Sequence, residues 1–243
     1  MAEKVRDLRS ALERLRNMPG QLAETDVEVD PMAELAGVYR YVGAGGTVKR
    51  PTKEGPAMIF RNVKGHPDAS VAIGVLASRK RVAALLDCEP ESLGKMLYHS
   101  VEEPIVPVEF QGAPPCQEVV HLATDPDFDL NRLVPAPTNT PDDAGPYITL
   151  GMCYASHPDT GLHDVTIHRL CIQGKDELSI FFTPAHATSA QWQTARRNWD
   201  RHFRFPSVSV LILRLRSVPV SSRRQHRSVT MSFPLRVHCG KSR

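Results

Sequence analysis

The sequence predicts a mixed α/β (α+β) protein, with an α/β unit first and an antiparallel sheet after it. In the first half, apolar segments of strand length alternate with segments of helical character. The strands are expected at 57–60 and 71–76, and the helices at 79–86 and 91–98. Farther along, three apolar segments are separated only by short turn-forming sequences. Because short turns favour antiparallel pairing, segments 147–156, 165–173 and 178–182 predict a three-stranded meander.

The N-terminal segment predicts two amphipathic helices. Apolar residues recur at helical spacing from Val5 to Met18, and Pro19-Gly20 predicts the end of this helix. Asp30 and Pro31 are residue types favoured at the N-cap and first position of a second helix, which an apolar stripe continues to Val42. The glycine-rich segment 42–47 is interpreted as a loop and not as a phosphate cradle, because no strand-then-helix pattern surrounds it.

The middle of the chain predicts a link between domains and a loop that leads into the meander. Segment 105–115 is extended and broken by prolines, as linkers are. A strand is expected at 118–123, a turn or short helix at 125–133, and a proline-rich loop at 133–146.

The composition is that of an ordinary soluble protein, with 41% apolar and 23% charged residues. No apolar run is long enough to span a bilayer, and the charged N-terminus lacks a signal-peptide core. The five cysteines are odd in number, widely spaced and free of any CxxC motif. These features predict reduced thiols and a cytoplasmic protein with no membrane partner.

Charge is unevenly distributed along the chain. Residues 201–243 carry nine Arg and one Lys and no acidic residue, so their net charge is +10, whereas the first 200 residues sum to −7. Segment 208–213 predicts one strand in this region, and 221–227 resembles a disordered basic tail. A tail of this kind raises the hypothesis of a nucleic-acid or membrane-surface binder, although we expect neither partner.

Polar side chains gather on the middle strand of the predicted meander, at the positions His163, Asp164, Thr166, His168 and Arg169. Such a group in an apolar sheet marks a candidate site. Taken alone, Arg169 fits a solvated or salt-bridged strand residue better than a catalytic one. Since side chains alternate along a strand, Asp164 and Arg169 lie on opposite faces, and a joint site requires a strand end or a bulge.

The chain resembles the N-terminal half of UbiD-type decarboxylases, which use prenylated FMN, from the opening helix to about Trp192. The most specific motifs are Asp159-Thr160-Gly161, the run from Asp164 to Arg169, and Pro184-Ala185-His186. Earlier markers follow in the same order as in the family: Asp30-Pro31, 55–65, 78–83, Asp129-Leu130 and 145–149.

The resemblance implies roles for individual residues. Arg169 matches the catalytic Arg, which contacts the substrate carboxylate and pairs with a glutamate in the family. Asp164 takes the place of a metal-binding Asn, and His186 matches a second ligand of Mn²⁺ or Mg²⁺, which K⁺ often accompanies. The residues expected to line the cofactor are Asp164, Thr166, Ile167, His168, Arg169, Ala185 and His186.

The resemblance also implies the fold and the activity. We expect an N-terminal α/β domain at 1–115, the first part of a split β-barrel that binds prenylated FMN at 116–204, and an aberrant basic Ser/Arg-rich tail at 205–243. The implied reaction is non-oxidative decarboxylation of an aromatic or α,β-unsaturated carboxylic acid. A UbiX-type prenyltransferase would supply the cofactor, and a homo-oligomer is the expected assembly.

The chain departs from the family pattern after residue 200. The family's third metal ligand and its proton-donating glutamates lie beyond the match to His186, and no Asp or Glu follows Asp200 here. The hypothesis is that the last forty or so residues are read in a shifted frame, which gives a truncated product with at most part of the active site. The alternative function is therefore a non-catalytic flavin- or metal-binding fragment.

Overall fold

A computed structural model describes residues 4–43, 54–105, 111–112, 118–156, 163–180, 207–212 and 229–232. The chain divides into two compact units, the first ending at Gly112 and the second beginning at Ala113. The two units are described separately. None of the described helices has the length and apolar character needed to cross a membrane.

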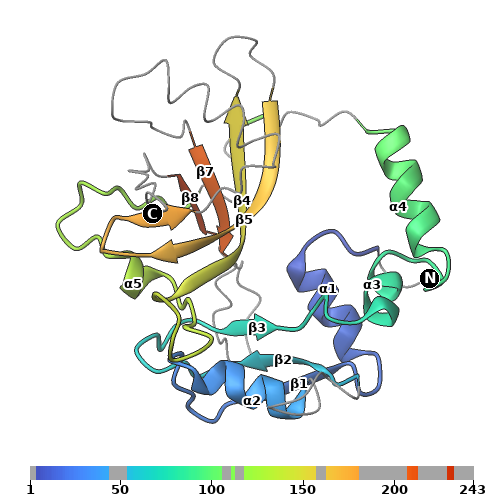
Figure 1. Ribbon diagram of the computed structural model, residues 1–243, viewed down its shortest axis with the longest axis horizontal. Helices are drawn as coiled ribbons and strands as arrows, with labels where there is room; N and C mark the ends of the chain where they lie inside the picture. The colour runs from blue at the N-terminus through green and yellow to red at the C-terminus, as the bar shows by residue number, and fades with distance from the viewer. Residues whose placement is uncertain are drawn as a thin grey trace. The chain divides into compact units, whose positions relative to one another are not determined.

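A three-stranded sheet forms the centre of the first unit (Figure 1). Its strands β1 (Leu22–Thr25), β2 (Ala57–Phe60) and β3 (Val71–Ile73) lie in this order, with β1 parallel to β2 and β3 antiparallel to it. The sequence predicted β2 and β3 but not β1, because the segment LAET is short and only half apolar. Strand β3 is shorter than the predicted 71–76, since Gly74 adopts a φ of 75° that ends the strand.

Strand β2 is buried on both faces and separates two apolar clusters. Ala57 packs with Ala11 and Leu15 of α1 (Leu8–Arg16) and with Leu85 of α3 (Arg79–Leu85). The alternate residues Met58 and Phe60 pack with Leu35 of α2 (Glu34–Val42). Because successive side chains of a strand point to opposite faces, the apolar run AMIF supports helices on both sides of the sheet.

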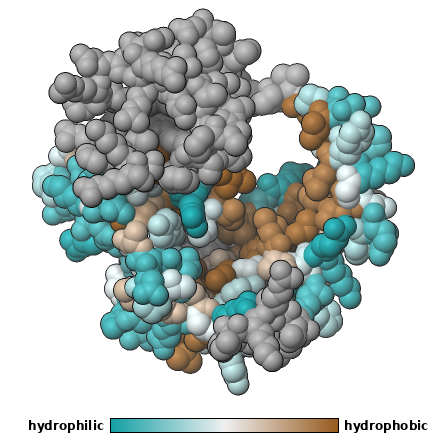
Figure 2. Space-filling view, viewed as in Figure 1, coloured by the Kyte–Doolittle hydropathy of each residue, from teal (hydrophilic) through white to brown (hydrophobic). Residues whose placement is uncertain are grey.

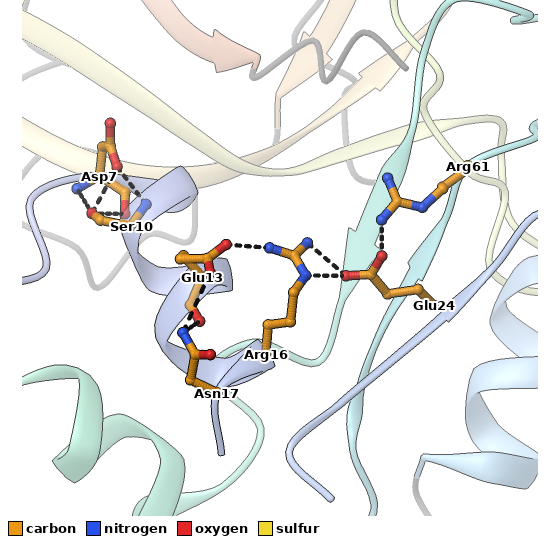
Figure 3. A network of polar contacts seen from close by, with 7 residues as sticks. All are labelled: Asp7, Ser10, Glu13, Arg16, Asn17, Glu24 and Arg61. Atoms are coloured by element: carbon orange, nitrogen blue, oxygen red, sulfur yellow. Dashed lines mark hydrogen bonds and ion pairs between the residues drawn. The ribbon is translucent and has the colours of Figure 1, made fainter. Parts of the chain in front are cut away.

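Helix α1 is capped and connected to the sheet by polar contacts (Figure 3). The Asp7 carboxylate accepts a hydrogen bond from the Ser10 amide at 2.8 Å, and the Ser10 hydroxyl accepts one from the Asp7 amide at 3.0 Å. This capping box holds the pKa of Asp7 below its usual value. At the other end, Arg16 pairs with Glu24 of β1 at 2.6 Å, and Glu24 also pairs with Arg61. Ion pairs this exposed contribute little to stability but define the α1–β1 contact.

The predicted start of α2 at Asp30 and Pro31 is wrong, because the helix begins at Glu34. The Asp30 carboxylate is used elsewhere: it accepts hydrogen bonds from the Met32 amide and from Lys64 Nζ, both at 2.8 Å. The Glu34 carboxylate accepts the Asp30 amide at 2.7 Å. A turn over residues 30–33 therefore precedes the helix.

Helix α4 (Leu93–Glu102) buries only Leu93 and exposes an apolar face. The exposed residues are Leu97, Tyr98, Val101 and, beyond the helix end, Ile105. Figure 2 shows apolar atoms gathered along one side of this helix. The helix expected at 91–98 is thus present, with its end four residues later than predicted.

A five-stranded antiparallel sheet forms the second unit, in the order β6-β5-β4-β7-β8 (Figure 1). Its strands are β4 (Tyr147–Ser156), β5 (His163–Ile172), β6 (Leu178–Ile180), β7 (Ser207–Ile212) and β8 (Val229–Ser232). The predicted meander is confirmed as β4, β5 and β6, and the strand expected at 208–213 as β7. Strand β8 was not predicted, and 221–227 lies outside the described residues.

The core of the second unit lies on one face of this sheet. It joins Cys153, Leu170, Ile172 and Leu178 of the strands to Phe128, Leu130 and Val134 around the short helix α5 (Leu130–Leu133). The strand predicted at 118–123 is wrong, since no strand forms there and Val120 and Leu122 are exposed. The backbone amide of Leu130 instead donates to the Lys175 carbonyl at 2.7 Å, which holds α5 against the β5–β6 turn.

Candidate functional site

The polar residues of the predicted site lie on β5, which pairs along its length with β4. His163 lies opposite Ser156, and this register continues as far as His168 opposite Gly151. It then shifts, because the next pair joins Leu170 to Ile148. Two residues of β4, at positions 149 and 150, thus face the single residue Arg169. This is a β-bulge whose extra residue belongs to β4. Since β5 is not interrupted, it is not the bulge that would bring Asp164 and Arg169 to one face.

The bulge determines which residues of β4 reach the core. Ile148 and Cys153 are five positions apart, so in a regular strand they would point to opposite faces. Both nevertheless pack in the cluster that contains Leu170 and Ile172 of β5. Because the bulge adds one residue to β4, Ile148 and Cys153 point to the same face, and the core face remains continuous on both sides of the bulge.

The opposite face of these two strands is apolar and open. Leu150, Met152 and Ile167 are 61%, 40% and 63% exposed, and Met152 lies directly opposite Ile167. Arg169, two positions after Ile167 on the same face, is also exposed. These four residues, Leu150, Met152, Ile167 and Arg169, form the exposed face of the sheet.

Arg169 contacts an aromatic ring at the edge of the exposed face. Its guanidinium carbon lies 5.8 Å from the centre of the Tyr147 ring. Tyr147 is paired with Cys171, so Tyr147 and Arg169 are diagonal cross-strand neighbours. Among the described residues, no carboxylate forms an ion pair with Arg169. The guanidinium is therefore available to bind a carboxylate from a ligand.

The Tyr147 hydroxyl is held on the other side by a thiol. It interacts with Cys171, which is buried and accepts a hydrogen bond from Gln173 Nε2 at 3.0 Å. Desolvation raises the pKa of Tyr147 above 10, the Cys171 contact raises it further, and the nearby Arg169 charge opposes the shift. The interpretation of Cys171 as a small core residue is confirmed by its burial.

The structure brings together only some of the predicted site residues. Ile167 and Arg169 share the exposed face, whereas half-buried His168 follows the alternation of Leu170 and points to the other face. The backbone of Asp164 pairs with Ala155, and that of Thr166 with Cys153. The side chains of these two residues, and the whole of Ala185 and His186, lie outside what the structure describes.

The metal site predicted at Asp164 and His186 depends on those same groups. Within the described part of the chain, no set of three or more His, Cys, Asp or Glu residues is placed to hold a metal ion. The two proposed ligands remain predictions from the resemblance. Any role of Mn²⁺, Mg²⁺ or K⁺ is likewise a prediction.

Sequence reasoning missed two of the three apolar members of the exposed face, and also Tyr147. Leu150 and Met152 read as ordinary strand residues, because alternation alone does not reveal which face has no covering layer. Tyr147 stands at the start of β4 and far from Arg169 in sequence. The spacing of aromatic and basic residues across a predicted hairpin is the signal that would have indicated their contact.

A flat apolar surface with a guanidinium at one side suits a planar ring that bears an anionic group. The three apolar side chains of the exposed face offer contact area to an aromatic system such as a flavin ring or an aromatic acid. Arg169 offers two parallel N–H groups to a carboxylate. The exposed face is therefore compatible with the implied flavin and its substrate.

Two family models match the chain. The 3-octaprenyl-4-hydroxybenzoate carboxy-lyase N-terminal domain matches residues 12–101, and the Rift-related domain of the same carboxy-lyase matches residues 108–209. Together they cover both units, including β4, β5 and β6. This chain belongs to the UbiD family.

Two similar proteins within this family are named as decarboxylases of aromatic acids. The gallate decarboxylase of Lactiplantibacillus plantarum is 52% identical over 185 residues, which are 76% of this chain and 38% of that protein. The apo structure of 3,4-dihydroxybenzoic acid decarboxylase from Enterobacter cloacae matches with a TM-score of 0.77 and 49% identity. The match covers 86% of this chain and 42% of that chain.

A more distant UbiD-class structure contains a flavin. It is an evolved dimeric form of HmfF from Pelotomaculum thermopropionicum in complex with prFMN, with a TM-score of 0.65 and 28% identity. The match covers 84% of this chain and 44% of that one. This chain thus spans about two fifths of the length of these relatives, and its mixed α/β fold matches the corresponding part of UbiD-class structures.

Proposed function

We propose that this chain forms the flavin-binding part of a UbiD-type carboxy-lyase that decarboxylates an aromatic carboxylic acid without net oxidation. The observation that carries the proposal is the exposed Arg169, which lies beside an apolar sheet face and has no carboxylate partner among the described residues. Membership of the UbiD family supports a decarboxylase and a flavin cofactor. Prenylated FMN is the proposed form, as in the HmfF complex.

Hydroxylated benzoic acids are the proposed substrates within the broader class of aromatic and α,β-unsaturated acids. Two of the relatives most similar to this chain are named for gallate and 3,4-dihydroxybenzoic acid. Both acids carry adjacent ring hydroxyls. An electron-rich ring of this kind packs well against apolar side chains such as Ile167 and Met152, while its carboxylate reaches Arg169.

The proposed reaction converts an aryl carboxylate and a proton into the arene and CO₂. The bond between the ring carbon and the carboxyl carbon breaks, and its electron pair stays on the ring carbon, which then accepts the proton. The flavin, when bound, supplies an electron-accepting ring system that stabilises this electron pair. In this chain, Arg169 holds the carboxylate in a fixed plane, and the apolar residues of the exposed face exclude water around it.

We further propose that the five-stranded sheet belongs to a split β-barrel. The proposed divisions are an α/β domain at 1–115, the partial barrel at 116–204 and the basic tail at 205–243, whose strands β7 and β8 join the same sheet. Antiparallel order and the position of β4 at the centre of the sheet support this proposal. A shifted reading frame in the tail and a cytoplasmic location stay predictions.

Asp164 and His186 are the proposed ligands of a divalent cation, Mn²⁺ or Mg²⁺, with K⁺ nearby. Oxygen and imidazole donors suit Mn²⁺, and a cation beside the flavin phosphate would offset its charge. A UbiX-type prenyltransferase is the proposed source of the cofactor. A homo-oligomer is the proposed assembly.

The experiment compares the full chain with Arg169→Ala and Arg169→Lys. Each protein is incubated with prenylated FMN and Mn²⁺, and CO₂ release is measured from carboxyl-labelled 3,4-dihydroxybenzoate and gallate. We expect turnover in the wild type and a loss of about 100-fold or more in Arg169→Ala, as for other groups that bind reacting anions. Arg169→Lys should recover only part of the activity, since an ammonium lacks the planar donor pair.

The alternative function is a non-catalytic fragment that binds flavin or metal. Retention of flavin through gel filtration without CO₂ release in any variant would favour it over the decarboxylase. Failure to retain flavin at all would contradict both functions. Turnover that is unchanged in Arg169→Ala would leave the reaction in place and remove Arg169 from it.

A further inference from the structure

We propose that Tyr147 is a positioning residue that holds the Arg169 guanidinium in the orientation needed to bind the substrate carboxylate. The inference rests on the proposed function, because it takes Arg169 as the carboxylate-binding group. Tyr147 itself need not touch the substrate. Its ring acts through Arg169.

Arg169 needs a positioning partner because little else in the described structure restrains it. Its side chain has several rotatable bonds and is exposed, so its free conformations are many. The bulge leaves it opposite two residues instead of one, without a direct Cα partner on β4. No described carboxylate pairs with it. Among the described residues, Tyr147 is the one aromatic residue in contact with it.

The Tyr147 ring is placed to provide this restraint. The distance of 5.8 Å from the guanidinium carbon to the ring centre is within the range of a cation–π interaction. An arginine stacked near a ring keeps its N–H groups free at the edge of its plane. Those groups can then donate to a carboxylate on the exposed face.

The backbone that carries the ring is held by two hydrogen bonds. The Tyr147 amide donates to the Pro137 carbonyl at 3.0 Å, and the preceding Pro146 carbonyl accepts the Ile172 amide at 2.9 Å. Its phenol interacts with the buried Cys171 thiol of the paired strand. Tyr147 thus stands on a rigid part of the sheet, next to the bulge that frees Arg169.

The test is a double-mutant cycle on ligand binding to the flavin-loaded chain, with 3,4-dihydroxybenzoate as the probe. Tyr147→Leu should weaken binding about fivefold, because it removes the ring and keeps an apolar side chain. Tyr147→Phe keeps the ring and should stay within about twofold of the wild type. In an Arg169→Ala background, Tyr147→Leu should have no further effect, as expected for a residue that acts through Arg169.

A matched control and a second readout separate positioning from general packing. Tyr98→Leu makes the same substitution at an exposed tyrosine of α4, and should not change binding. In NMR spectra, the Arg169 side-chain Nε–H resonance should carry a ring-current shift that is present in Tyr147→Phe and lost in Tyr147→Leu. This readout does not depend on activity.

The outcomes distinguish the two proposals. Equal weakening by Tyr147→Leu in the wild-type and Arg169→Ala backgrounds, or an unchanged Arg169 resonance in Tyr147→Leu, would overturn the positioning role. Binding that is unaffected by Arg169→Ala would overturn the proposed role of Arg169. In that case, the NMR shift still decides whether Tyr147 holds the guanidinium.

Discussion

At the scale of single residues, Arg81 and Arg169 differ in burial, and this difference indicates different roles. Arg81 is 1% exposed, and its Nη1 donates to Gln21 Oε1 and to the Gly55 carbonyl, both at 3.1 Å. Desolvation lowers its pKa, but a guanidinium stays charged at any ordinary pH. Arg169 is exposed and contacts a ring. The first therefore stabilises the fold, and the second is available to a ligand.

Arg81→Met should lower the free energy of unfolding by about 2–3 kcal/mol, because it leaves the half-buried acceptors at Gln21 and Gly55 without this donor. Chemical denaturation of the full chain measures the change. Arg79→Met is the matched control, since Arg79 is exposed and makes one long contact, 3.4 Å to the Pro90 carbonyl. The control should stay within about 0.5 kcal/mol of the wild type. Equal effects of the two variants would contradict the structural role of Arg81.

Cys153 should resist alkylation in the native protein. Burial in the core raises the pKa of its thiol to about 11, so almost no thiolate is present at pH 8. Half-buried Cys88 is the internal comparison, and mass spectrometry after iodoacetamide treatment should show Cys88 modified first. Rapid modification of Cys153 in folded protein would contradict its burial.

The raised pKa of Cys153 also predicts a pH dependence of stability. A thiol whose pKa is higher in the folded state stabilises the fold below its unfolded value of 9.0, and this contribution is lost as pH rises toward about 11. Stability should therefore fall between these values by at most about 1.4 kcal/mol per pH unit. Cys153→Ala should remove this part of the slope, and an unchanged slope would contradict the assignment.

At the scale of the elements, the bulge in β4 organises the candidate site. It lets Ile148 and Cys153 share the core face and leaves Arg169 opposite two residues. The close approach of the strands beside it requires a glycine. A Cβ at Gly151 would lie 2.8 Å from Leu170 Cδ1 and 3.0 Å from the His168 carbonyl oxygen.

Gly151→Ala should therefore destabilise the second unit by about 1–3 kcal/mol, because Leu170 must move within a packed core. Gly94→Ala on α4 is the matched control, as a Cβ there meets no atom within 4 Å. In a helix, that change should be neutral or stabilise by up to about 1 kcal/mol. Thermal unfolding of both variants measures the difference. A stable Gly151→Ala variant would show that β4 and β5 pair less closely than the register indicates.

At the scale of the whole molecule, the sheet of the second unit depends on a strand from the basic C-terminal region. Strand β7 pairs with the edge of β4 through Met152 opposite Ser209 and Tyr154 opposite Ser207. Strand β8 extends the sheet by one more strand. Without them, β4 would present unpaired amides and carbonyls to other molecules.

Deletion of residues 205–243 should promote association of the chain, because it exposes the edge of β4. Static light scattering measures this at increasing protein concentration. Deletion of 233–243 alone retains β7 and β8 and is the control, which should scatter like the full chain. The same two variants test the nucleic-acid hypothesis, since DNA binding that survives the longer deletion would exclude the +10 segment as its cause.

Much of the fold could be predicted from patterns of neighbouring residues in the sequence. The helical spacing of Leu8, Leu12 and Leu15 predicted α1, the apolar run AMIF predicted β2, and short turns predicted the meander. Strands β1 and β8 escaped prediction because each is four residues long and is defined mainly by its neighbour in the sheet.

For the candidate site too, some features could be predicted from the sequence and others could not. The sequence by itself determined the family motifs, the choice of Arg169, and the alternation that puts it and Asp164 on opposite faces of a regular strand, since these depend on residue types and on a period of two. Only the tertiary structure decided that the extra residue lies on β4, that Leu150 and Met152 are uncovered, and that Tyr147 meets Arg169. Those features depend on the pairing of two strands and on which face the core covers, and neither is encoded in the alternation of a single strand.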